Sequence, residues 1–163
     1  MTAFVGCDPG NTGAVCAIRE DGTAIGLASF RRAMDVPVLS AVVQALKGFD
    51  PIYWAIEKPI TVRGNAVRSV AHQWANYGCV YGLAAYLSGD SYKEFVYTPE
   101  PAAWKATMRV TADKKSSIQK VLDMGWATEK DLFASERART MSADRAEAIL
   151  LSHYCRKIFG GGL

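Results

Sequence analysis

The sequence predicts an α/β domain in which a mixed, five-stranded β-sheet is flanked by helices. The first half of the chain carries short apolar runs separated by turn-forming residues, and the second half carries mainly helical patterns. A helical pattern also separates the third apolar run from the fourth, which is typical of a crossover to a neighbouring parallel strand. Strands joined by turns and strands joined through a helix together indicate a mixed sheet covered by helices.

Three strands are predicted at the start of the chain, at residues 3–8, 13–19 and 23–30. The turn-rich segments Pro9-Gly10-Asn11 and Glu20-Asp21-Gly22 separate them. Because such short connections join antiparallel neighbours, these strands are expected to form a β-meander.

A helix and a fourth strand come next. An apolar helical pattern runs from Val36 to Leu46 and is closed by Gly48 and Pro51. The fourth strand is predicted at residues 52–57. Since the chain reaches it through the helix, this strand is expected to lie parallel to a neighbour in the sheet.

A long helical pattern runs from about Ala66 to Leu87, after a loop at residues 59–64. Its apolar and aromatic content exceeds what one buried stripe needs. Part of this helix is therefore predicted to pack against a second subunit, because large exposed apolar patches usually mark interfaces. Gly78 and Gly82, four residues apart, would permit close helix approach. The alternative is full burial under the sheet.

The remaining predicted elements are a fifth strand at residues 94–98, a short helical turn that starts at Pro99, Pro101 and Trp104, a helix from Asp113 to Met124, and a last helix from Ser142 to Phe159. No repeat or linker interrupts the 163 residues, half of which are hydrophobic. This length and composition fit a single domain spanning residues 1–163.

The composition indicates a soluble, intracellular (cytoplasmic) protein. The sequence has no run of about 20 apolar residues and no signal-like N-terminus, so we expect no membrane association. The four cysteines lack C-x-x-C spacing and are expected to be reduced and mostly buried. His72 and His153 stand alone on apolar helical patterns, so core or interface positions are expected rather than metal ligation.

Four carboxylates stand where the folded chain would bring them together. Asp8 ends the first strand pattern and Glu57 ends the fourth. Asp144 and Glu147 are three residues apart, so they share one face of the last helix, for which Ser142 is a suitable N-cap. Like charges clustered beside apolar strands are unfavourable unless a cation or protons neutralise them.

Carboxylates are the ligands that hard divalent cations prefer, so these four acids predict a site for Mg²⁺ or Mn²⁺. Two such ions can activate water and stabilise the leaving oxygen in phosphodiester cleavage. Acids in a first helical turn also occur for structural reasons, because they stabilise the positive helix end. The presence of all four acids in the expected elements favours the metal site.

Basic residues follow the acids in two stretches, the first with Lys58, Arg63 and Arg68 and the second with Lys105, Arg109, Lys114, Lys115 and Lys120. The net charge is only +3, so the overall charge is a weak indication of nucleic-acid binding. If these stretches flank the acids, they would hold DNA phosphates while metal masks the carboxylates. The alternative for either stretch is a solvated helix face.

Several short motifs occur in a specific order: Asp8-Pro9-Gly10-Asn11-Thr12-Gly13, Ile56-Glu57, Asn65-Ala66, Thr98-Pro99 with Trp104-Lys105, Val110-Thr111 with Lys114-Lys115, and Asp144-Arg145-Ala146-Glu147-Ala148. In this order and spacing the chain resembles the RuvC-type Holliday-junction resolvases over nearly its whole length. The resemblance implies a ribonuclease H-like nuclease domain that forms a homodimer. It also implies symmetric nicking of four-way DNA junctions with Mg²⁺ or Mn²⁺.

The resemblance further implies roles for individual residues. The metal ligands would be the four acids, Asp8, Glu57, Asp144 and Glu147. Basic residues near the scissile phosphate would be Lys105 and one of Lys114 or Lys115. Lys115 fits slightly better when the position is counted back from Ile118. Glu147 departs from the family's common Asp or His, and Pro59 alters the loop that in the family reaches toward the junction centre.

Three other functions are considered for this sequence. Asp8-Pro9-Gly10-Asn11-Thr12-Gly13 also resembles the phosphate-binding hairpin of actin- and hexokinase-like ATPases, but those proteins need two lobes and this chain is too short for both. A junction-binding protein that no longer cuts would have lost an acidic ligand, whereas all four positions are occupied. A broader endonuclease for forks, flaps and three-way junctions is the main alternative to a strict junction resolvase.

Overall fold

A mixed five-stranded sheet forms the centre of the computed structural model, which describes residues 1–31, 36–61, 66–135 and 137–161. Its strands are β1 (Ala3–Asp8), β2 (Thr12–Arg19), β3 (Ala24–Arg31), β4 (Ile52–Ile56) and β5 (Val96–Tyr97). They lie in the order β3-β2-β1-β4-β5. β1 pairs antiparallel with β2 and parallel with β4, so the predicted meander and crossover are confirmed.

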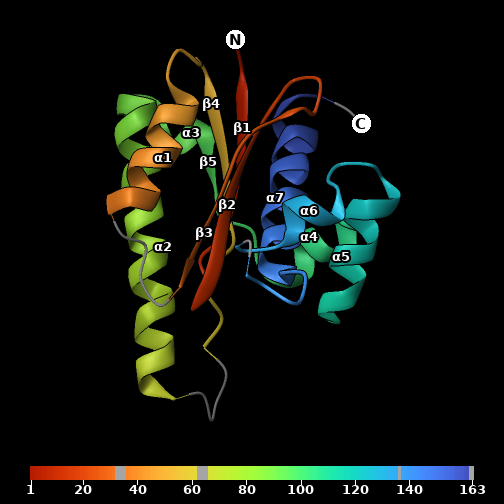
Figure 1. Cartoon of the computed structure of the whole chain (residues 1–163). Helices are drawn as coiled ribbons and strands as arrows, with labels where there is room; N and C mark the ends of the chain where they lie inside the picture. The colour runs from red at the N-terminus through yellow and green to blue at the C-terminus, as the bar shows by residue number, and fades with distance from the viewer. Residues whose placement is uncertain (32–35, 62–65, 136, 162–163) are drawn as a thin grey trace.

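Helices cover both faces of this sheet (Figure 1). On one face lie α1 (Val36–Leu46), α2 (Val67–Ser88) and α3 (Tyr92–Phe95), the last two joined by the 3₁₀ turn Gly89–Ser91. On the other face lie α4 (Pro101–Met108), α5 (Lys114–Asp123), α6 (Glu129–Leu132) and α7 (Ala143–Phe159). Among the described residues no helix has both the length and the hydropathy needed to span a membrane.

The hydrophobic core lies in two layers, because successive side chains of a strand point to opposite faces. On β1, Phe4 belongs to the layer under α4–α7, whereas Val5 and Cys7 belong to the layer under α1 and α2. All six residues of β1 are buried, as expected for a strand covered on both sides. Asp8 lies four residues after Phe4 on the same strand, so its side chain points to the same face, toward α7.

Gly6 lets α7 pack directly against β1. A Cβ atom at this position would lie 2.1 Å from the backbone nitrogen of Ser152 and 2.4 Å from the carbonyl oxygen of Ala148. Both clashing atoms belong to helical backbone, which cannot move without shifting the helix. This contact fixes the distance between the end of β1 and the first turns of α7.

Gly6→Ala is expected to lower the free energy of unfolding by about 3 kcal/mol, the upper range for forcing extra volume into a packed core. Gly78→Ala is the matched control, because a Cβ on this α2 glycine meets nothing within 4 Å. In a helix interior that change is expected to be stabilising by about 0.5–1 kcal/mol. Urea unfolding of both variants measures the difference, and equal effects would contradict the proposed close packing.

The fifth strand is shorter than predicted. Residues 94–98 were expected to be extended, but only Val96 and Tyr97 pair with β4, and α3 ends at Phe95. The Phe95 ring packs on Tyr53 with 5.3 Å between ring centroids, so this apolar residue completes a helical turn against the sheet. The short helix α6 was not predicted; it begins at a capping box between Thr128 and Asp131.

Helix α2 is only partly buried, which makes the alternative of full burial wrong. Its buried residues among those described are Asn76, Val80 and Ala84. Trp74 is 41% exposed and Tyr86 is 83% exposed. The outer face of this helix is therefore available for a partner, and packing against a second subunit remains a proposal.

Three of the four cysteines and His153 occupy the core positions expected for them. Cys7, Cys16 and Cys155 are buried, Cys79 is exposed, and all four are free thiols. The His153 ring is buried and stacks on Trp126 with 3.7 Å between ring centroids. Among the described residues neither ring nitrogen has a hydrogen-bond partner. Burial, aided by the charge of Arg156, lowers the pKa of His153 to about 3.

The low pKa of His153 predicts acid sensitivity. The folded state keeps this ring neutral down to about pH 3, whereas the unfolded chain binds a proton near pH 6.5. The free energy of unfolding should therefore decrease as the pH falls from about 6.5 toward 3, by about 1.4 kcal/mol per pH unit. His153→Phe should remove this dependence. Urea unfolding at several pH values in that range measures the effect. His72→Gln, at a half-exposed position, is the control. An equal dependence of the unfolding free energy on pH for wild type and His153→Phe would refute the prediction.

Candidate metal centre

Asp8 and Glu57 reach the same edge of the sheet because of strand register. β1 and β4 are parallel, and Cys7 lies opposite Ile56, so the next residues on the two strands are neighbours. The backbone N–H of Glu57 donates to the carbonyl oxygen of Cys7 at 2.9 Å, which extends the pairing by one residue. Both carboxylates therefore leave the sheet at one point and on the face covered by α7.

Asp144 and Glu147 come from the beginning of α7. The Ser142 hydroxyl accepts a hydrogen bond from the backbone N–H of Arg145 at 3.3 Å, which makes Ser142 the N-cap, as predicted. Asp144 and Glu147 are one turn apart and lie on the face that packs against β1. Glu147 is 4% exposed, so its carboxylate lies inside the protein.

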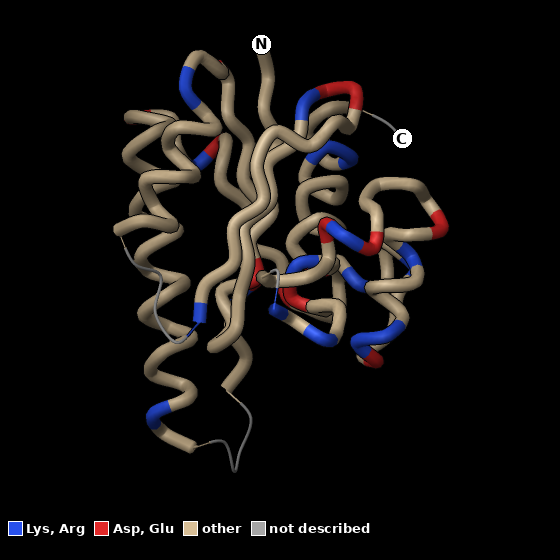
Figure 2. The backbone as a smooth tube through the Cα atoms, viewed as in Figure 1, with Lys and Arg blue, Asp and Glu red and all other residues tan. Residues whose placement is uncertain are grey.

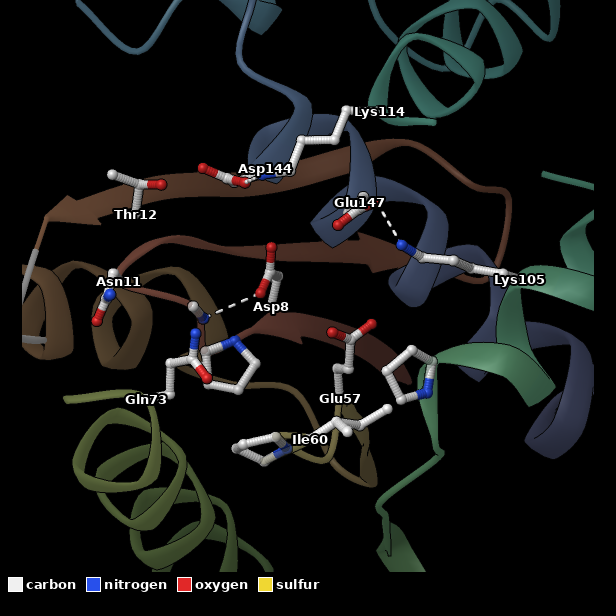
Figure 3. Close-up of a pocket in the computed structure, with 14 residues that line it drawn as sticks. Asp8, Asn11, Thr12, Glu57, Ile60, Gln73, Lys105, Lys114, Asp144 and Glu147 are labelled. Carbon is white, nitrogen blue, oxygen red and sulfur yellow. Dashed lines mark hydrogen bonds and ion pairs between the residues drawn. The ribbon is translucent and has the colours of Figure 1, made fainter. Parts of the chain in front are cut away.

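The carboxylates of these elements converge on one cavity of about 410 Å³, shown in Figure 3. Oxygen atoms of Asp8, Asp144 and Glu147 all lie within 4.8 Å of one another. Glu57 lines the same cavity but lies outside this triplet. The sequence thus predicted four acids around one site, and three of them form its tight centre.

Burial dominates the electrostatics of Asp8. It raises the pKa of this carboxyl well above its usual value, and the charges of Glu57, Glu147 and Asp144 raise it further. The hydrogen bond from the Gly10 backbone N–H, 2.9 Å long, acts in the opposite direction. The cluster is therefore unfavourable as a set of bare anions and is stabilised by any bound cation or proton.

Glu57 is held by a neighbouring indole. Burial raises the pKa of Glu57, while the hydrogen bond that Trp104 Nε1 donates to Glu57 Oε2 lowers it. Trp104 itself is fully buried in α4, so it cannot easily turn away. This contact fixes one oxygen of Glu57 and leaves the other directed at the cavity (Figure 3).

Two lysines form ion pairs with the acids of α7. Lys105 Nζ lies 2.8 Å from Glu147 Oε1, and Ser117 Oγ lies 3.3 Å from the same oxygen. Lys114 Nζ lies 2.8 Å from Asp144 Oδ1. Burial acts against the charge of Lys114, yet its bond to Asp144 and the surrounding acids raise its pKa overall. Positive charge is thus held on two sides of the acidic cluster.

The donor set fits a divalent cation of the hard type. It consists of carboxylate oxygens only, two of the three central residues are buried, and no histidine or cysteine belongs to the group found in the described part of the chain. Oxygen-only donors at this spacing suit Mg²⁺ or Mn²⁺ better than Zn²⁺.

The other predicted basic residues are spread more widely. Lys58 pairs with Glu100 at 3.5 Å on the surface, and Arg63 lies outside the described residues. Arg68 lines a neighbouring recess, and Arg109 lines another between α4 and α5. Lys115 is exposed and does not line the acidic cavity, whereas Lys114 does. The structure thus brings Lys114 to the acidic cavity, although the sequence slightly favoured Lys115, and the role of either lysine stays a prediction.

Several cavity residues were missed at the level of sequence. Asn11 contributes from the β1–β2 turn and Thr12 from the start of β2. Ile60 contributes from the segment after β4, and Gln73 from α2. Asn76 Nδ2 donates to the carbonyl oxygen of Gly10 at 3.1 Å, which docks the turn on α2. The polar residues Ser69, Gln73 and Asn76 recur at helical spacing. This periodicity indicates that one face of α2 contacts polar groups of the protein or of a ligand.

Comparisons with known proteins identify the fold. No protein-family model matches the sequence, and no curated protein does. Among solved structures, the chain is similar to T. thermophilus RuvC in complex with a Holliday junction substrate, with a TM-score of 0.62 and 16% sequence identity. The match covers 94% of this chain and 92% of that chain. At this identity the likeness shows a RuvC-like, ribonuclease H-type α/β fold, as predicted.

Proposed function

We propose that this protein is a divalent-metal-dependent endodeoxyribonuclease that resolves four-way (Holliday) junctions by paired nicking. The observation that carries the proposal is the cavity in which Asp8, Asp144 and Glu147 converge, with Glu57 beside them. The fold is similar to that of RuvC, whose solved structure holds a Holliday junction. Single-domain organisation over residues 1–163 belongs to the same proposal.

Each acid has a distinct part in holding the metal. Asp8, Asp144 and Glu147 would bind one Mg²⁺ or Mn²⁺, and Glu57 with Asp8 would hold a second. Bound there, such ions supply Lewis-acid activation of water and stabilisation of the leaving oxygen in phosphodiester hydrolysis. Trp104 keeps Glu57 oriented through its indole N–H. Gly10 does the same for Asp8 through its backbone N–H.

The lysines provide fixed positive charge around the phosphate. Lys105 is mostly buried, with 18% of its side chain exposed, and it keeps Glu147 in place. Lys114 has 64% of its side chain exposed while its amine lies at the cavity. Its amine can therefore shift from Asp144 to a phosphate oxygen without leaving the site. Charge of this kind stabilises the oxygen atoms of a phosphodiester as negative charge builds during cleavage.

Paired incision requires two such sites, and the outer face of α2 offers a surface for a homodimer. Gly78 and Gly82 leave open space above the helix, and the exposed Trp74 and Tyr86 lie four residues before Gly78 and four residues after Gly82. Light scattering at micromolar concentration tests this step. A dimer that Gly78→Glu converts to monomer is the expected result, and a wild-type monomer would argue against paired nicks.

The decisive experiment uses labelled four-way junction, fork, flap and linear duplex, each with Mg²⁺, Mn²⁺ or EDTA. Metal-dependent paired nicks confined to the junction support the proposal. Cutting across all branched forms favours a broader branched-DNA endonuclease. Tight junction binding without cleavage in either metal would show an inactive junction-binding protein instead.

A further inference from the structure

A second recess adjoins the acidic cavity and carries the opposite charge. It has a volume of about 410 Å³ and is lined by Asn11, Thr12, Arg31, Arg68, Ser69 and His72. Arg31 ends β3, while Arg68 and His72 lie one turn apart on α2. We call it the Arg31–Arg68 recess. None of the described residues that line it is acidic.

Both arginines of this recess are without an ion-pair partner in the part of the chain that the structure describes, since no carboxylate of residues 1–31, 36–61, 66–135 and 137–161 forms a salt bridge with either. Two guanidinium groups that share one recess repel each other, and a bound anion relieves that repulsion. The recess is therefore the electrostatic counterpart of the acidic cavity, which a cation stabilises.

Its neutral lining also suits an oxygen-rich anion. Asn11 Nδ2 donates to Ser69 Oγ, so the Ser69 hydroxyl keeps its own proton for a further acceptor. The Thr12 hydroxyl is exposed at the same wall. Guanidinium forks with adjacent hydroxyl donors are typical of phosphate recognition.

The position of the recess relative to the acids selects one kind of anion. Asn11 and Thr12 line both hollows and form the wall between them. In Figure 3 these two residues lie on the side of the acidic cavity opposite Lys105. Figure 2 shows that most of α2 carries no charged residue apart from one basic position near its start. A polyanionic strand crossing the acids would thus continue past Thr12 into the recess.

We infer that the Arg31–Arg68 recess binds a backbone phosphate of the same DNA strand whose neighbouring phosphodiester lies over Asp8. This inference rests on the proposed function and deepens it, because it assigns the path of the strand on both sides of the cut. Lys105 and Lys114 hold one side, and Arg31 with Arg68 holds the other. The contacts are to phosphate, so they position the strand without reading its sequence.

The double variant Arg31→Gln/Arg68→Gln tests the inference. Affinity for a labelled four-way junction is measured in EDTA by fluorescence anisotropy at several KCl concentrations. We expect binding about 10–100-fold weaker, and a plot of log affinity against log salt whose slope is smaller by about 1, the value for one lost phosphate contact. Lys47→Gln/Lys93→Gln is the matched control, because it removes the same charge from exposed positions outside both hollows.

The possible outcomes separate this inference from the proposed function. If the arginine variant and the lysine control have equal affinity and equal salt slopes, the recess does not bind a phosphate. If wild type binds the junction but cuts it with neither Mg²⁺ nor Mn²⁺, the nuclease proposal fails while a selective loss in the arginine variant still supports the recess. Wild type that binds no DNA overturns both. Thermal unfolding of each variant confirms that the fold is retained.

Discussion

Replacing Asp8 by Asn is expected to abolish metal-dependent cleavage, with a loss of at least about 10³-fold in rate, on the scale seen when a central catalytic group is removed. The charges of all three other acids act on Asp8, and its oxygen atoms belong to the tight triplet with Asp144 and Glu147. An amide occupies the same volume but cannot carry the charge that binds a divalent cation. Junction cleavage in Mg²⁺ and in Mn²⁺ measures the effect.

The same substitution is expected to stabilise the protein in EDTA. Burial and three neighbouring acids raise the pKa of Asp8, so the ionised carboxyl destabilises the folded state at neutral pH. Asn removes that charge, and the unfolding temperature should rise by roughly 2–4 °C for each kcal/mol of relieved repulsion. Asp90→Asn, at an exposed position, is the control and should change little. A lower unfolding temperature for Asp8→Asn would contradict the electrostatic account.

Loss of activity and gain of stability have one physical cause in this prediction. Carboxylates brought together around an apolar strand end repel one another, and the same repulsion gives the cluster its affinity for a cation. Added Mg²⁺ or Mn²⁺ should therefore stabilise wild type more than Asp8→Asn, since only wild type retains the full charge of the site. A purely structural role for Asp8 predicts that added metal stabilises the two proteins equally.

The convergence of the four acids could be predicted from sequence because it depends on simple geometry. Asp8 and Glu57 end neighbouring strands, and the ends of parallel strands meet at one edge of a sheet. Asp144 and Glu147 are three residues apart, which places them on one helix face. The turns of the meander and the limits of α1 could also be predicted from the sequence, since Gly and Pro residues mark them.

Other contacts between elements distant in sequence could not be predicted. Trp104 orients Glu57 only because α4 packs on α7 and brings this indole to Glu57, and no local pattern specifies that packing. Residues 94–98 have strand-like composition, yet the packing of Phe95 on Tyr53 favours a helical turn there. The choice between Lys114 and Lys115 depended on the rotation of α5 about its axis, which follows from its contact with α7.

Lys114→Met is expected to reduce junction cleavage by about 10²–10³-fold, the usual effect of removing one group that stabilises charge in a transition state. The Lys114 amine lies at the acidic cavity, 2.8 Å from Asp144 Oδ1. Methionine keeps the length and most of the apolar stem of lysine but removes the charge. Single-turnover cleavage at saturating junction measures the rate without a contribution from binding.

Lys115→Met is the matched control for this prediction, because it makes the same chemical change one residue away. Successive residues of an α-helix are rotated by about 100°, so Lys115 cannot present its amine to the cavity that Lys114 reaches. Lys115 is exposed on α5, and its backbone N–H donates to the side chain of the N-cap residue Asp113, a bond that Met would keep. Its replacement should leave the rate within about threefold. If Lys115→Met loses activity and Lys114→Met does not, α5 is rotated when DNA is bound. The preference for Lys115 that the sequence suggested would then hold for the DNA-bound protein.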